Sequence, residues 1–66
     1  MIIYINDLPM EFEENSTLND IISSMDNLPK QIALALNNAI IAKNKWENTV
    51  CKNGDRIVVV ELVCGG

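Results

Sequence analysis

Histidine is absent from this chain of 66 residues, and only two cysteines are present. A zinc site of the usual four-ligand kind therefore cannot be built from these residue types, and the commonest general base in catalysis is missing. The sequence also lacks a pairing of nucleophile with base and a phosphate-binding glycine loop. We expect that the protein is not an enzyme and has no metal site.

Basic residues and long apolar runs are also scarce. Lysine and arginine number 5 against 9 acidic residues, which gives a net charge of -4 and a pI near 4.4. That charge disfavours nucleic acid and anionic membrane as partners and favours a basic surface on another protein. The apolar stretch 1–5 is followed at once by Asn6 and Asp7, so it resembles neither a signal peptide nor a membrane span. We expect a cytoplasmic protein in which Cys51 and Cys64 are free thiols.

The residues that are present have the composition of a small folded domain. Hydrophobic residues make up 48% of the chain and charged residues 21%, which is typical of a globular core and not of disorder. A chain this short buries only about 60% of its unfolded surface, which leaves little room for a deep catalytic pocket. A binding or carrier module is therefore favoured.

The first third of the chain predicts a hairpin followed by a helix. Residues 1–5 form a strand, a turn follows, and 10–13 alternate apolar and acidic residues as a second strand does. The side chains expected to point inward are Ile3, Ile5, Met10 and Phe12. Thr17 then supplies a helix N-cap with Asp20 near the positive end, and the apolar stripe of the helix is Leu18, Ile21, Ile22 and Met25. Asp26, Asn27 and Pro29 end this helix, and we expect no second one.

The remainder predicts three more strands. Residues 32–36 and 40–41 flank a turn at Asn37 and Asn38, and 43–46 form one tight turn that places Trp46 under the sheet. The last strand, 57–63, follows a turn at 53–55 and is apolar except for one residue, which predicts a position between other strands. Two strands, a helix and three further strands make an α+β fold, in which one main helix packs across one face of a sheet.

The last strand has two faces, one of which no helix covers. The alternation assigns Val58, Val60 and Leu62 to the helix side and leaves Ile57, Val59, Glu61 and Val63 as the partner face, or the reverse if the register slips by one residue. An uncovered apolar strip is a natural docking surface for another protein. A more thickly wrapped sheet or self-association would also account for it.

The chain ends in two glycines, Gly65 and Gly66. Because glycine has no Cβ, such a pair can thread a narrow cleft and present the terminal carboxylate to a partner enzyme. A frayed tail is the alternative interpretation. We therefore expect a folded domain over residues 1–63 and a flexible tail over 64–66.

Several of these features, in this order, resemble the ubiquitin-like β-grasp sulfur carriers, and among them those of thiamine biosynthesis. The residues that carry the resemblance are Asn6, Ser16-Thr17-Leu18, Ala35-Leu36-Asn37, Trp46 after a basic residue, Asn53-Gly54-Asp55-Arg56-Ile57 and the closing Gly65-Gly66. Two departures are Ala42-Lys43, where the family often has Pro-Arg, and Cys64 beside the glycines. The resemblance implies a β-grasp fold with a mixed sheet of about five strands.

The resemblance also implies a chemistry for Gly66. A ThiF-like (E1-like) adenylyltransferase would use ATP and magnesium to adenylate its carboxylate, and sulfur from a cysteine desulfurase would then convert it to a thiocarboxylate. Thiazole synthase (ThiG-like) would take up that sulfur. The chain itself would bind no cofactor.

Three other functions stay open at this point. The small subunit of molybdopterin synthase shares the fold and the sulfur chemistry but is usually longer. A ubiquitin-like modifier would be joined through Gly66 to lysines of target proteins, and a plain β-grasp binding or regulatory domain would have no use for the glycines. Cys64 either completes the last strand or forms a thioester with the activated carboxylate, and we favour the packing role.

Overall fold

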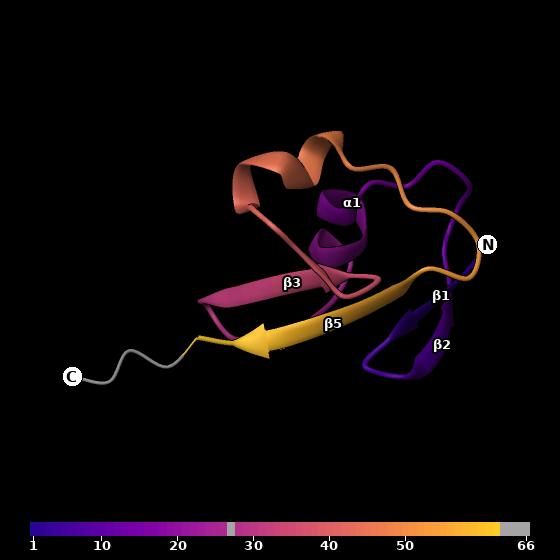
Figure 1. The fold of residues 1–66 in the computed structure, drawn as a ribbon. Helices are drawn as coiled ribbons and strands as arrows, with labels where there is room; N and C mark the ends of the chain where they lie inside the picture. The colour runs from indigo at the N-terminus through magenta and orange to yellow at the C-terminus, as the bar shows by residue number, and fades with distance from the viewer. Residues whose placement is uncertain (27, 63–66) are drawn as a thin grey trace.

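A computed structural model of the chain describes residues 1–26 and 28–62. Its elements, in order, are β1 (Ile2–Ile5), β2 (Leu8–Glu11), α1 (Leu18–Ser23), β3 (Ile32–Leu36), β4 (Ala39–Ile41), the 3-10 helix η1 (Lys43–Asn48) and β5 (Arg56–Glu61). The strands form one five-stranded sheet in the order β2-β1-β5-β3-β4 (Figure 1). Because β1 and β5 are parallel and the other neighbours antiparallel, the sheet is mixed, and the last strand lies in its middle as predicted.

Two tight turns set the register of the antiparallel hairpins. Asn6 and Asp7 have φ of 48° and 69°, and Asn37 and Asn38 have φ of 49° and 72°. Asparagine and aspartate tolerate this left-handed conformation, and two-residue turns with positive φ match the twist of the flanking strands. The turns pair Ile5 with Leu8 in one hairpin and Leu36 with Ala39 in the other.

The second strand begins two residues earlier than predicted and includes a proline. Pro9 lies opposite Tyr4, and the Phe12 N–H donates to the Met1 carbonyl at 2.9 Å. Hydrogen-bonded and non-bonded pairs alternate along such a ladder, so the ring nitrogen of Pro9 faces the outer edge and no ladder bond is lost. Met10 lies on the core side but remains 40% exposed because β2 is an outer strand of the sheet, whereas Phe12 packs against the core as expected.

The helix begins as the sequence indicates. The Thr17 hydroxyl accepts from the Asp20 N–H, and the Asp20 carboxylate accepts from the Thr17 N–H, both at 3.1 Å, so the two residues form a capping box. Of the predicted stripe, Leu18 and Ile21 are buried, while Ile22 and Met25 are partly buried. The helix ends at Ser23, before the stop predicted at Asp26, Asn27 and Pro29. Of these three residues, Asn27 lies outside the described residues.

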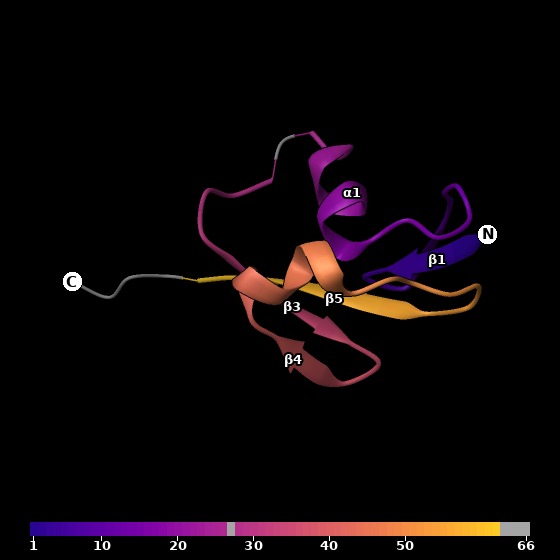
Figure 2. The same ribbon diagram turned by 90° about the horizontal axis from the view of Figure 1, so that it is seen from above.

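The core lies between the sheet and the two helices. Its buried members are Ile3, Ile5, Leu18, Ile21, Leu34, Trp46, Cys51 and Ile57. Where one tight turn was predicted, η1 runs over six residues; it places Trp46 in the core, with the indole N–H donating to the Ile41 carbonyl at 3.0 Å. Figure 2 shows η1 beside α1 over the strands. No helix in the described ranges has the length and hydropathy of a membrane span.

Adjacent residues of β5 should differ sharply in their contribution to stability. Ile57 is 1% exposed and Val58 is 44% exposed. We expect Ile57→Ala to lower the free energy of unfolding by about 2–5 kcal/mol, because it leaves a cavity in the core. Val58→Ala should cost less than about 1 kcal/mol. Urea unfolding of the two variants measures the difference, and equal losses would contradict the assignment of the two faces.

Candidate functional site

The residues with a predicted chemical role lie outside the described part of the chain. This applies to Gly65 and Gly66, and also to Val63 and Cys64 and thus to the predicted boundary between domain and tail. The described structure ends at Leu62, directly after β5. The candidate site is therefore β5 with the surfaces beside it, because this strand leads to the terminal residues.

The turn before β5 attaches the beginning of this strand to its neighbours. The Asn53 side-chain oxygen accepts from the Ile2 N–H, and the Gly54 N–H donates to the Ile2 carbonyl, both at 2.7 Å. Gly54 has a φ of 89°, which residues with a Cβ rarely adopt. The Asp55 carboxylate accepts from the Asn37 amide at 3.2 Å. The start of β5 is thus held to β1 and to the turn after β3.

Two turn asparagines continue this attachment along β5. The Asn37 side-chain oxygen accepts from the Arg56 N–H at 3.0 Å, and the Asn6 side-chain oxygen accepts from the Val59 N–H at 2.9 Å. Both side chains satisfy backbone donors for which the sheet provides no carbonyl. The sequence marks these asparagines only as turn residues, because their partners are distant along the chain.

The predicted assignment of Ile57, Val59, Glu61 and Val63 to the partner face is wrong, as the register of β5 shows for Ile57 and Val59. Ile57 lies opposite Ile5, and Val59 lies opposite Leu34, so both face the helix side. Ile57 is buried and Val59 packs against the core, which removes both from any docking surface. Of the other two residues of that face, Glu61 is exposed and Val63 lies outside the described residues. The reverse assignment, left open by the sequence, is the one that the structure adopts.

The uncovered side of the sheet is apolar along β5. Val58 and Val60 are each 44% exposed and Leu62 is 51% exposed, although all three are apolar. In Figure 1, α1 and η1 both lie above β3 and β5, on the other side of the sheet. We define the open face as the set Ala33, Ala35, Ile40, Val58, Val60 and Leu62. Its apolar strip runs toward the end of the described chain.

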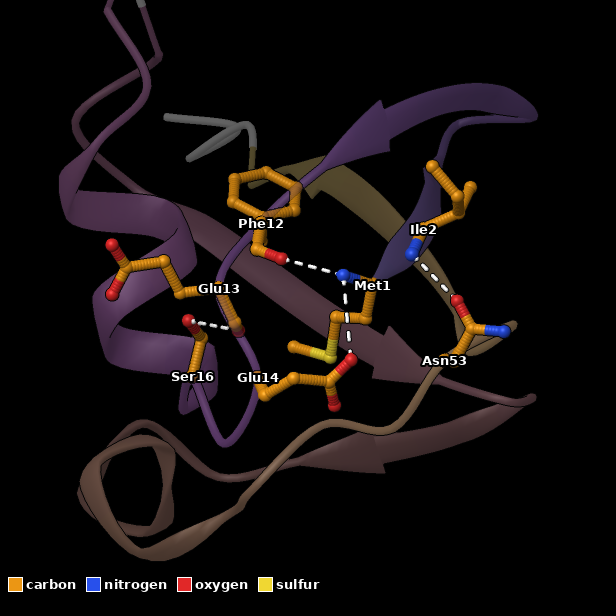
Figure 3. Close-up of polar contacts among 7 residues, drawn as sticks. All are labelled: Met1, Ile2, Phe12, Glu13, Glu14, Ser16 and Asn53. Carbon is orange, nitrogen blue, oxygen red and sulfur yellow. Dashed lines mark hydrogen bonds and ion pairs between the residues drawn. The ribbon is translucent and has the colours of Figure 1, made fainter.

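The acidic residues after β2 have structural contacts. The Met1 amine donates to the Phe12 carbonyl at 2.8 Å and lies 3.6 Å from a Glu14 carboxylate oxygen (Figure 3). The neighbouring Ser16 hydroxyl donates to the Glu13 backbone carbonyl at 2.8 Å. The Glu14 side chain is 75% exposed, so this ion pair is a solvated surface contact. Within the described ranges, no group of three acidic or cysteine side chains is placed to hold a metal ion.

A groove of about 800 Å³ lies beside the end of β5, between the end of α1 and the start of η1. Its apolar lining includes Ile22, Met25, Ile32, Ile41, Trp46 and Leu62. The charged residues that line it are Asp26, Lys30 and Lys43. An apolar lining with a few charged groups is typical of a binding surface.

Cys51 is buried and has a strongly shifted pKa. Its side chain belongs to the core and is 2% exposed. Burial, with a smaller effect of the Asp55 carboxylate, raises the pKa of the thiol from 9.0 to about 11. A thiol that stays protonated at neutral pH is a poor nucleophile. Cys51 therefore contributes packing to the core.

Over the described residues, a mixed five-stranded sheet, one α-helix across one face and a central last strand define a β-grasp domain of the ubiquitin-like kind. A sequence profile of the ThiS family matches residues 3–66, and the chain therefore belongs to the ThiS family. This confirms the resemblance found in the sequence.

Two relatives agree with this assignment. The chain is 27% identical over 66 residues to the sulfur carrier protein ThiS of Escherichia coli K12, with 100% of both chains covered. Its fold is similar to the crystal structure of the thiamine biosynthesis protein ThiS from Geobacter metallireducens, with a TM-score of 0.86, 19% identity and 100% of both chains covered. At that identity, the second similarity concerns the fold alone.

The raised pKa of Cys51 makes stability depend on pH in the alkaline range. The folded chain keeps the thiol proton up to about pH 11, whereas the unfolded chain releases it near pH 9.0. The folded state therefore binds more protons in this interval, and the free energy of unfolding falls as the pH rises. We expect a steeper fall for the wild type than for Cys51→Ala, measured by urea unfolding at several pH values. Parallel curves would contradict the shift.

Proposed function

We propose that the chain is a sulfur carrier of thiamine biosynthesis, whose Gly66 carboxylate is activated and converted to a thiocarboxylate. The ThiS family match supports this most directly, because it includes residue 66. The similarity to the sulfur carrier protein of Escherichia coli, which extends over the full length of both chains, also supports it. Family membership favours this role over a molybdopterin synthase subunit, a protein modifier or a plain binding domain.

The proposed chemistry takes place at the terminal carbonyl. In the active site of a ThiF-like enzyme, the carboxylate attacks the α-phosphate of magnesium-bound ATP, which releases pyrophosphate and leaves an acyl adenylate. The terminal sulfur of a cysteine persulfide then displaces AMP. A thiol cleaves the sulfur–sulfur bond and becomes part of a disulfide, which leaves the thiocarboxylate. Its sulfur is the nucleophile that a ThiG-like thiazole synthase receives.

The fold is consistent with separate roles for the folded domain and for the tail, the residues after Leu62. Four residues follow Leu62 in the sequence. Extended within an enzyme's cleft, four residues span up to about 14 Å, so the carbonyl can react while the domain stays outside. The terminal glycines carry no Cβ that would obstruct the path or crowd the reacting carbon. In this proposal the domain is recognised and the tail is the substrate, so the chain itself is not a catalyst.

The open face supports the recognition step. Its apolar strip lies on the strand that leads to the tail, so an enzyme bound there would also be next to the terminal residues. Contiguous exposed apolar surface frequently marks a protein interface. We propose that the activating enzyme contacts Val58 and Val60.

Intact mass spectrometry tests the tail chemistry. Incubation with ATP, magnesium, a ThiF-like enzyme and a persulfide donor should increase the mass by the difference between sulfur and oxygen. A chain lacking Gly66 should show no increase, and Gly66→Ala should react more slowly because its Cβ crowds the carbonyl. An unchanged mass with an enzyme that is competent on another carrier would count against the proposal, as would an unaffected Gly66→Ala.

Kinetics of activation test the open face. We expect Val60→Ser to raise the KM of the activating enzyme for the carrier by about tenfold, because it removes apolar contact area. Met10→Ser is the matched control, since Met10 is 40% exposed, close to the 44% of Val60, but lies on the opposite side of the sheet. A similar KM for the two variants would argue against recognition through this face.

A further inference from the structure

The strand that leads to the tail has a free backbone edge. Leu62 donates its N–H to the Gln31 carbonyl at 2.9 Å, and Arg56 accepts from the Asn37 N–H at 2.8 Å. Because bonded positions alternate in an antiparallel ladder, the even-numbered residues of β5 direct their backbone groups toward β3. The backbone groups of Ile57, Val59 and Glu61 therefore point to the opposite edge.

The neighbour on that opposite edge covers only half of β5. Pairing with β1 stops at Ile5 and Ile57, and the Asn6 N–H donates to the Ile57 carbonyl at 2.9 Å. The Asn6 side chain then accepts from the Val59 N–H. Figure 1 shows the hairpin of β1 and β2 beside one end of β5, while the arrowhead end runs beside β3 alone.

Three backbone groups of β5 are left at this edge. They are the Val59 carbonyl, the Glu61 N–H and the Glu61 carbonyl, and none has a hydrogen-bond partner among residues 1–26 and 28–62. We call these three groups the free edge. Unpaired groups on the second half of an otherwise central strand are a template on which another extended chain can pair.

β2, one of the two outer strands of the sheet, is protected in a way that the free edge is not. On β2, the outward positions are Pro9 and Glu11, and Pro9 has no N–H to offer. Proline at an outer edge hinders pairing with a further strand. The free edge has no proline, and it is flanked by the exposed side chains of Val60 and Leu62. An added strand would therefore also gain apolar contacts on the open face.

We propose that the free edge binds an extended segment of the activating enzyme, which would pair with β5 at the positions that β1 does not cover. The proposal rests on the proposed function and specifies how the partner recognises the carrier. Glu61 would donate one hydrogen bond and accept another, and Val59 would accept a third. Alternate residues of the segment would lie beside Val58 and Val60, so they should be apolar. A basic residue would complement the exposed carboxylate of Glu61.

Amide hydrogen exchange tests the pairing in the intact wild-type chain. With ¹⁵N-labelled carrier, the Glu61 amide should exchange at least about tenfold more slowly when the activating enzyme is bound. The Glu11 amide is the internal control, because it also points outward, but from β2. Its exchange rate should not change, and the Val60 amide should be protected in both states because it faces β3.

A matched pair of proline substitutions tests the same hydrogen bond. Glu61→Pro removes the N–H of the free edge without removing a ladder bond, and Glu11→Pro removes an equivalent N–H from the outer edge of β2. We expect Glu61→Pro to lower kcat/KM for activation at least about tenfold relative to Glu61→Ala, which keeps the N–H. Glu11→Pro should leave kcat/KM unchanged. Comparison with Glu61→Ala separates the N–H from the side chain.

The outcomes distinguish this inference from the proposed function. Thiocarboxylate formation with an unprotected Glu61 amide in the complex would overturn the strand pairing and leave the carrier function standing. Equal protection of Glu61 and Glu11 would also overturn it. Failure to form any thiocarboxylate with competent enzymes would overturn both proposals. If Glu61→Pro does not fold, the exchange experiment alone decides, since it requires no substitution.

Discussion

The register of β5 between β1 and β3 is the constraint on which the rest of the structure depends. Ile57 lies opposite Ile5 and Val59 lies opposite Leu34, which brings buried side chains together on the helix side. A slip by one residue would turn Ile57 toward water and Val58 toward the core. Apolar packing alone distinguishes the two registers only weakly, because both would bury valine or isoleucine side chains of similar size. The hydrogen bonds of the turns before and beside β5 are specific to one register, so they supply the discrimination.

Local features of the sequence predicted most of the fold, because each depends on residues close together in the chain. The Thr17 and Asp20 capping box, the asparagine turns and the position of Trp46 are of this kind. Which face of β5 is buried could not be predicted in the same way. Residues 57–60 are all apolar, so they show no alternation, and only pairing with distant strands decides which of them are buried. The start of β2 was missed because proline is tolerated only where its nitrogen faces outward, and that depends on the pairing.

The candidate site likewise combines features that are evident from the local sequence with contacts between distant residues that are not. Gly65 and Gly66 are evident from composition and position, and family membership supports their role. The contacts that guide β5 toward them are not evident, because Asn6 binds Val59 and Asn53 binds Ile2, partners separated by 53 and 51 residues. Asn6, Asn37 and Asn53 were part of the resemblance to the sulfur carriers. Their contacts give that resemblance a physical meaning, since all three hold backbone groups of β1 or β5.

In the proposed function, one strand of this small domain serves both stability and recognition. On its helix side β5 contributes Ile57 and Val59 to the core, and on its β3 side its even-numbered residues complete the ladder. What remains is the open face and the edge beyond Asn6, and neither belongs to the buried core. Substitutions at these two surfaces can therefore alter recognition with little loss of stability, whereas changes on the core side would affect both. The Asn6 contact covers the β1 side of β5 only as far as Val59. The edge is therefore free on the half of β5 that is nearest in sequence to the proposed substrate tail.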